Sequence, residues 1–428
     1  MTHLDLNLNP FFVPPSLPDH LLRLKSRMSR QWAAGWLILV AFGTALSPFV
    51  MSDQRNLLSI LVAALALPAI VLLRLPMRND LAWSAATMAY LIVVELLHGG
   101  GRNFTSVGYT GMFVLSYVAF CGTLYTGAVT RQRLITLLGW LLYAYAGVAM
   151  LQFVCSSVGL PVPNHILSKE TWSYNSLGVE PSHAARAVAF TLLAYLILKR
   201  WNGPAWTLGE VWQREKRALA AFTISLILSG SSLAVGILPL TILMALRLRW
   251  LMVGFAILVV SWPFLETVEA DSIHRLVAFI TALPSLDIMA LVQADHSGAL
   301  RVMPLIIFLQ SAKIGDVSVW LGGGYEAINY YIQGRLIGVG EDASAAGFIP
   351  GYVMICGIIG SFLFCHTFIL RFVNGQTIPL ILLWVIILAN SAWNSQIFWY
   401  TLIILRAVHH FSGMPAHAGR PAVRRAGP

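Results

Sequence analysis

Charge is what this sequence has least of. Charged residues make up 11% of the 428 positions and hydrophobic residues make up 57%. A soluble globular protein has about a quarter of its residues charged. Apolar runs of the length that crosses a bilayer, about 20 residues, recur along the whole chain. The composition therefore excludes two or three soluble domains and predicts one all-α, polytopic membrane helix bundle.

Cysteine is also scarce, and its distribution does not suggest a metal site. The four cysteines lie in or beside apolar runs, without a CxxC pair and without a histidine at ligand spacing. We therefore expect no disulfide and no metal, and the sequence calls for no cofactor. The cysteines are Cys121, Cys155, Cys356 and Cys365.

Acidic residues are almost absent from the apolar runs. Glu95 lies near the outer end of its run, and His366 is a lone histidine of the kind that is usually packed in a core. Proton-coupled pumps need ionisable groups at mid-depth, so the sequence disfavours that class. The net charge of +10 does not indicate nucleic-acid binding either, because the basic residues form short clusters between apolar runs.

The basic residues define an orientation. If the N-terminus is cytoplasmic, the inner segments carry 20 of the 28 lysines and arginines. We expect about 12 spans, within a range of 10 to 12. The expected spans lie near 32–51, 56–74, 81–98, 107–128, 134–156, 182–199, 218–231, 232–246, 250–268, 347–370, 377–393 and 395–408. The pairs 218–231/232–246 and 377–393/395–408 are short enough for each to be either a hairpin or one broken helix.

The domain organisation follows from these spans. A cytoplasmic segment, 1–31, precedes a transmembrane domain, 32–410, and a disordered cytoplasmic tail, 411–428, rich in Gly, Pro, Ala and Arg, follows it. Two outer loops stand out, 157–181 and the long 269–346. The apolar pieces 276–286 and 302–309 within the second loop are too short to span and predict helices at the membrane surface or over the bundle.

The segment 180-EPSHAAR-186 places an acid, an imidazole and a guanidinium at the entrance of an apolar run. Pro181 fits the first turn of a helix, and Glu180 suits the positive helix end. Glu180, His183 and Arg186 are spaced to share one sector of the helix. The sequence leaves two interpretations open. One is a capped helix with a snorkelling arginine, and the other is an acid/base and phosphate-binding edge.

Three further motifs have their own interpretations. In 295-DHSGALR-301, adjacent Asp, His and Ser cannot point at one another as a triad does, whereas Arg301 could bind phosphate or sugar. The glycines of 320-WLGGGYEAINYY-331 predict a sharp turn or a close backbone approach. Its aromatic residues suit either sugar stacking or an interfacial belt. The segment 229-SGSS-232 predicts a turn at a helix end.

Together these segments resemble the O-antigen polymerase/ligase superfamily, the integral-membrane enzymes that join lipid-linked glycans. The resemblance covers roughly 130–370 and rests on topology and motif order. It is carried by 178-GVEPSHAA-185, 297-SGALR-301, 321-LGGGYEA-327 and 347-GFIPGYVMICGIIGSFLF-364. Two departures matter. Ser232 stands where many members carry arginine, and 341-EDASAAGF-348 lacks the histidine typical of ligases. The second departure favours a polymerase.

The resemblance implies an activity. A bacterial inner-membrane glycosyltransferase would polymerise undecaprenyl-pyrophosphate-linked repeat units into exopolysaccharide or O-antigen at its periplasmic face. The transfer would be inverting and metal-independent, with both termini cytoplasmic. The implied partners are the glycan lipid, membrane lipids and a polysaccharide chain-length regulator, with no nucleic acid.

The sequence also suggests which residues act. The candidate acid/base residues are Glu180, His183 and Asp342. The candidate ligands of the pyrophosphate or the sugar are Arg186, Arg301, Arg335 and Tyr325. Three alternatives remain open. They are an O-antigen ligase that transfers glycan to lipid A-core, a lipid-linked oligosaccharide flippase and a structural membrane scaffold.

Overall fold

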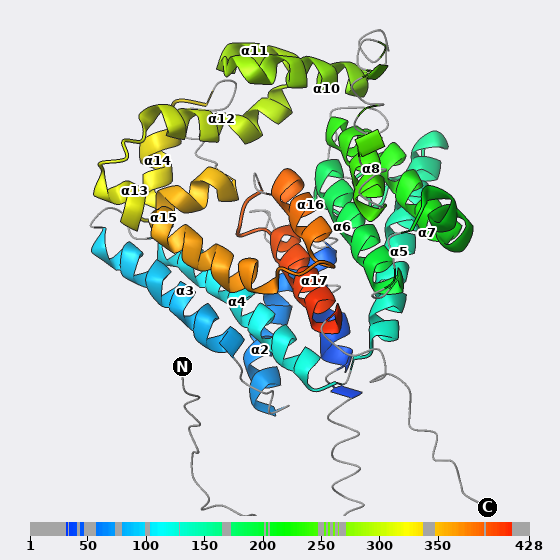
Figure 1. Ribbon diagram of the computed structural model, residues 1–428, viewed down its shortest axis with the longest axis horizontal. Coiled ribbons are helices and arrows are strands. Elements are labelled where there is room, and N and C mark those ends of the chain that lie inside the picture. Colours follow the sequence, from blue (N-terminus) through cyan, green and yellow to red (C-terminus); the bar gives the residue numbers. More distant parts are fainter. Residues whose placement is uncertain are drawn as a thin grey trace, which may run out of the picture.

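The structure is a computed structural model of an all-α protein (Figure 1). It describes residues 57–72, 79–98, 271–336, 347–388 and 391–412 and, with gaps in places, 31–46, 103–164, 173–246 and 252–264. Apart from an isolated bridge between Trp206 and Leu246, the regular elements in these ranges are helices. The all-α prediction is therefore confirmed for the part of the chain that is described.

Among the described residues, five helices are long and apolar enough to cross a membrane. At 1.5 Å per residue, even the shortest is about 29 Å long, close to the thickness of a bilayer's hydrocarbon core. They are α3 (Asn79–Leu97), α4 (Phe104–Tyr125), α5 (Arg131–Ser157), α6 (Pro181–Arg200) and α15 (Phe348–Phe368). Each of them coincides with an expected span.

Other expected spans are also helical but are shorter or more polar. They are α2 (Leu57–Leu72), α7 (Leu208–Ser229), α8 (Ser232–Ala245), α16 (Ile378–Leu388) and α17 (Gln396–Ser412). The expected span 250–268 lies largely outside the described residues. A multi-pass helical membrane protein is thus supported, and the total of about 12 spans stays a prediction.

Helix α7 begins ten residues earlier than the apolar run that predicted it. Thr207 and Glu210 form a capping box, in which each side chain bonds the other residue's backbone N–H. The helix ends at Ser229, where Gly230 adopts a left-handed conformation, and Ser231 then precedes α8. The predicted turn at 229–232 is confirmed. It joins two helices that pack on each other, so this pair is a hairpin.

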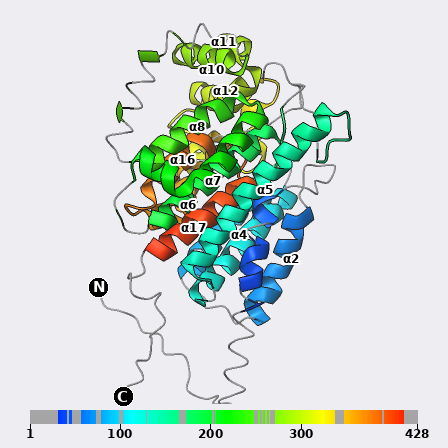
Figure 2. The same cartoon turned by 90° about the vertical axis from the view of Figure 1, so that its right-hand side faces the viewer.

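Helix α6 lies at the centre of the bundle. It packs against α5, α7, α8, α16 and α17, and its side chains from Ala184 to Leu198 are all buried. A helix that is apolar on every side belongs in the interior. The EPSHAAR segment therefore opens α6, which packs against five other helices (Figures 1 and 2).

Short helices cover one end of the bundle. They are α10 (Asp271–Ala282), α11 (Ile288–Ala294), α12 (His296–Ser311), α13 (Val317–Leu321) and α14 (Glu326–Ile332). Helices α10 and α11 lie across this end in both views (Figures 1 and 2). Helix α10 packs on α8, and α12 packs on α15. The helices predicted around 276–286 and 302–309 are therefore confirmed.

The glycine turn 322–324 docks on an interruption in α15. The backbone of α15 leaves the helical conformation at Gly357. The N–H groups of Gly323 and Gly324 donate to the carbonyls of Met354 and Ile355, at 2.9 and 3.1 Å. A Cβ on Gly322 would lie 2.1 Å from the Ile355 carbonyl oxygen. The predicted close backbone approach is confirmed, and its partner is the broken helix.

At the opposite end of the bundle, one carboxylate holds several helices together. Asp80 at the start of α3 forms ion pairs with Arg406 of α17 at 3.2 Å and with Arg371 after α15 at 3.4 Å. Tyr125 at the end of α4 donates to the same carboxylate at 2.5 Å. Asp80 and Arg406 are each only 4% exposed. We call these four residues the Asp80 cluster.

Candidate functional site

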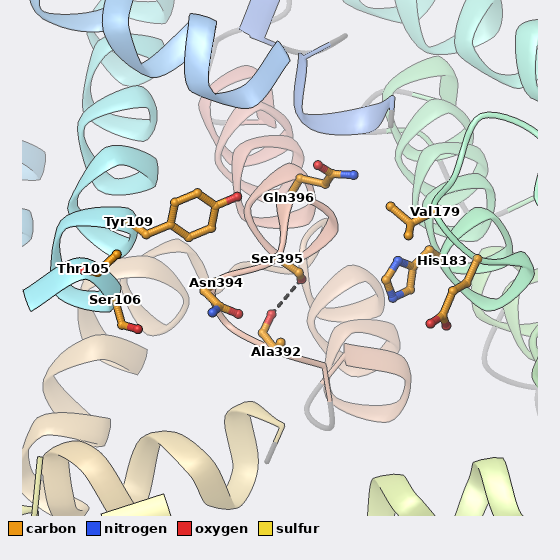
Figure 3. A pocket seen from close by; sticks show the side chains of 10 residues that line it. Thr105, Ser106, Tyr109, Val179, His183, Ala392, Asn394, Ser395 and Gln396 are labelled. Atoms are coloured by element: carbon orange, nitrogen blue, oxygen red, sulfur yellow. Dashed lines mark hydrogen bonds between the residues drawn. The ribbon is translucent and has the colours of Figure 1, made fainter. Parts of the chain in front are cut away.

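A cavity of about 390 Å³ opens between three segments at the end of the bundle that α10–α12 cover. One wall is the first turns of α4, with Thr105, Ser106 and Tyr109. The opposite wall is the entrance of α6, with Val179, Glu180 and His183. The connection between α16 and α17 lies between them, through Ala392, Asn394, Ser395 and Gln396 (Figure 3).

The entrance of α6 is a preformed turn. Pro181 is the first helical residue, as predicted, and the Glu180 carbonyl accepts the His183 N–H at 3.0 Å. The Ser182 hydroxyl donates to the Glu180 carboxylate at 3.2 Å. Asn175 donates to the Gly178 carbonyl at 2.7 Å, which ties the preceding loop to this turn. The acid and the imidazole are therefore presented to the cavity by a fixed backbone.

Arg186 lies one helical turn below His183 and is 4% exposed. Its Nη1 donates to the Ser391 hydroxyl at 2.8 Å, which links α6 to the α16–α17 connection. Its Nε–H has no hydrogen-bond partner among the described residues. A buried guanidinium without a carboxylate partner is electrostatically costly. Arg186 is therefore not the snorkelling side chain of the first interpretation, and it gives this end of the bundle a fixed positive charge.

Arg301 approaches the same turn from the covering helices. It lies in the second turn of α12, whose first turn is capped by Asp295 accepting the Gly298 N–H at 3.0 Å. Its Nη2 donates to the Ser182 hydroxyl at 3.3 Å. Ser182 in turn donates to Glu180, so arginine, hydroxyl and carboxylate form one chain of contacts. Asp295 acts as a helix cap in this arrangement.

Tyr325 lies behind the cavity wall and is buried. Its hydroxyl pairs with Thr110 of α4 at 3.1 Å, and its ring packs on Trp393 with centroids 6.0 Å apart. Burial raises the pKa of the Tyr325 phenol to about 12. Tyr325 therefore supports two segments that line the cavity and does not itself line it.

Two other candidates lie apart from this group. Arg335 follows α14 and donates to the Ser311 hydroxyl at 2.9 Å. Ser311 ends α12, about 15 Å along the helix from Arg301 at 1.5 Å per residue. Arg335 is therefore not brought to the cavity. Asp342 lies outside the described residues.

The sequence interpretation missed two of the three segments that line the cavity. Tyr109 falls within the expected span 107–128. The 391–396 connection falls where two short expected spans meet, which the sequence left open as a hairpin or one broken helix. The available signal was the polar run 394-NSQ-396 between apolar helices, at an end that the basic residues assign to the outer side. Nothing in the sequence places that run against the start of α6.

The fold and the site define a class: a helical membrane protein with a polar cavity at one end of its bundle, bordered by two arginines. No protein-family model, no curated protein and no solved structure matches the chain.

Proposed function

We propose that the protein is a membrane glycosyltransferase that polymerises undecaprenyl-pyrophosphate-linked repeat units at the outer face of a bacterial inner membrane. The observation that carries the proposal is the convergence of Glu180 and His183 in one cavity with Arg186 and Arg301 beside them. This combination supplies a base for a hydroxyl and cations for a phosphate leaving group. The sequence resemblance gives the reaction class.

The proposed reaction is a single displacement. The hydroxyl of the acceptor sugar loses its proton to Glu180 or His183 as its oxygen bonds the anomeric carbon of the donor. The bond from that carbon to the pyrophosphate oxygen breaks, and undecaprenyl pyrophosphate leaves with the electron pair. Attack opposite the leaving group inverts the anomeric centre. Arg301 and Arg186 stabilise the negative charge that develops on the pyrophosphate.

The direct test is the lipid-linked glycan profile of a deletion strain. The strain is complemented with wild type, Glu180→Gln, Arg301→Ala or Lys313→Ala, at matched membrane expression. Lys313 is exposed, lies just after α12 and does not line the cavity, so Lys313→Ala is the control for loss of an outer cation. Glu180→Gln keeps the shape of the side chain and removes its charge.

Accumulated single repeat units on the lipid carrier, with polymer restored by wild type and Lys313→Ala only, are the expected result. Long chains that remain on the carrier would indicate a ligase instead. A loss of glycan lipid from the outer leaflet without loss of bond formation would indicate a flippase. Full polymer yield from both site variants would refute the proposed site.

A further inference from the structure

The lining of the cavity is almost uncharged, although arginines lie nearby. Glu180 is the only carboxylate among its ten lining residues, and no lysine or arginine lines it. The other polar groups are hydroxyls, amides and the imidazole of His183. A pocket that binds a diphosphate would be expected to expose cations or backbone N–H groups to it. This cavity is suited to a different part of the substrate.

The two arginines belong to the borders of the cavity. Arg186 lies beneath it, and its Nη1 is engaged by Ser391. Arg301 contacts Ser182, which is buried at the side of the α6 entrance. The two arginines therefore lie next to the nearly uncharged cavity, and Glu180 and His183 line the cavity on the side that faces them.

The groups opposite Glu180 have the chemistry that recognises sugar hydroxyls. Asn394 and Gln396 offer amide donors and acceptors, and Ser106 offers a hydroxyl. Tyr109 extends from α4 into the cavity (Figure 3) and presents a flat apolar face on which the C–H groups of a pyranose can pack. Its ring is fixed by an edge contact with Phe113, with centroids 5.2 Å apart.

We propose, on the basis of the function proposed above, that this cavity is the subsite for the acceptor's terminal sugar. The sugar it takes is an uncharged pyranose, and it discriminates against sugars that carry a carboxylate. A volume of 390 Å³ lies near the lower end of the range for small-molecule sites, about 300–1,000 Å³. Glu180 is the only charged side chain among the ten lining residues, and the two arginines are engaged at the border by Ser391 and Ser182. An acidic sugar inside the cavity would therefore place a second carboxylate beside Glu180, and like charges at close range are repulsive.

Matched pairs of sugars test this in the purified full-length protein in nanodiscs. Glucose is compared with glucuronate and galactose with galacturonate, because each pair differs only at the C6 group. Binding is followed by saturation-transfer NMR. We expect at least one neutral sugar to bind. Its acidic partner should bind with an affinity at least about tenfold lower. Glu180→Gln should reduce that discrimination.

Variants locate the binding. Tyr109→Ala should weaken neutral-sugar binding about tenfold, a loss typical of removing a stacked ring. Tyr109→Phe keeps the ring and should retain most of the affinity, and Lys313→Ala should retain all of it. Equal thermal melting of the variants shows that Tyr109→Ala has not unfolded the protein.

Three results would overturn the subsite: acidic sugars binding as tightly as neutral ones, no binding of any neutral sugar, or unaltered binding by Tyr109→Ala. The proposed function can fail separately. If the purified protein binds no sugar but the deletion strain accumulates single repeat units, the polymerase proposal is retained and the acceptor must bind outside this cavity. If the purified protein binds neutral sugars but the deletion strain still makes polymer, the sugar subsite is retained and the polymerase proposal is refuted.

Discussion

Glu95 shows at the scale of one residue how the cavity wall is held. One carboxylate oxygen accepts the backbone N–H of Asn103 at 2.6 Å, just before α4 begins. The other accepts the backbone N–H of Tyr325 at 3.0 Å, at the end of the glycine turn. The side chain is 3% exposed. An acid that the sequence placed near the end of a span therefore serves as a bridge between two backbones.

The first prediction concerns this bridge. Glu95→Gln should lower the free energy of unfolding by about 1–3 kcal/mol, because the amide NH₂ cannot accept one of the two buried N–H groups. Thermal melting of the purified variant in detergent measures it. Glu326→Gln is a matched control, since Glu326 is exposed and accepts a hydrogen bond from Asn329 of its own helix at 3.0 Å. An equal melting temperature for Glu95→Gln and wild type would contradict the bridge.

At the scale of elements, the interruption of α15 and the glycine turn form one unit. Gly357 has φ +65° and Gly322 has φ +97°, both in the region that favours glycine. A Cβ on Gly357 would lie 2.2 Å from the Trp320 carbonyl oxygen. The carbonyls that the interruption leaves without helical partners are satisfied by the turn, as any buried backbone in an apolar environment requires.

The second prediction is that Gly357→Ala and Gly322→Ala are each severely destabilising. The clash is with backbone atoms, so the two segments must separate, and we expect a loss beyond about 4 kcal/mol or no folded protein. Gly315→Ala is the control because a Cβ there meets nothing within 4 Å. The measurement is the yield of monodisperse protein after extraction. Normal yield of both variants would show that the turn does not dock as described.

The sequence predicted most elements but not their details. Apolar runs located α3, α4, α5, α6 and α15 because hydrophobic length is a local property. The start of α7 was missed because its first turns are polar and depend on the Thr207–Glu210 capping box. The interruption at Gly357 was missed because it depends on a turn more than thirty residues earlier in the chain.

At the scale of the whole molecule, the Asp80 cluster fixes the end opposite the cavity. It joins α3, α4, α17 and the residues after α15 through one buried carboxylate. Removing one partner from a buried ion pair costs about 3–5 kcal/mol because the remaining charge is left without compensation. Loss of the Asp80 carboxylate would leave both Arg371 and Arg406 without this partner.

The third prediction follows: Asp80→Asn should destabilise the protein by about 3–5 kcal/mol. Asp316→Asn, at an exposed position whose side chain makes no cap hydrogen bond, should change stability little. Both variants are compared by thermal melting and by the fraction recovered in the membrane. An unchanged melting temperature of Asp80→Asn would show that the Asp80 cluster does not stabilise the bundle.

The fourth prediction tests the proposed orientation. In a background without the native cysteines, Ala392→Cys should react with a membrane-impermeant maleimide added to intact spheroplasts. Gln132→Cys, exposed at the start of α5, should react only after permeabilisation. The reverse pattern would place the cavity on the cytoplasmic side and would exclude a periplasmic reaction.

The candidate site was predicted in part. Glu180, His183, Arg186 and Arg301 come together, and three of them lie within one short segment of chain. Arg335 does not join this group and Tyr325 lies behind the cavity wall, because their positions depend on how α12 to α14 fold over the bundle. No local pattern encodes that packing, and the same is true of the 391–396 connection.

The Glu95 bridge also has a consequence for biosynthesis. Its two backbone partners are separated by more than two hundred residues, and Tyr325 leaves the ribosome long after α3 and α4. Until Tyr325 has been synthesised, α3 and α4 must hold the Glu95 carboxylate with only the Asn103 N–H as a donor. The first half of the protein therefore cannot reach its finished form alone, and a nascent chain stalled before Tyr325 would be a natural substrate for membrane quality control.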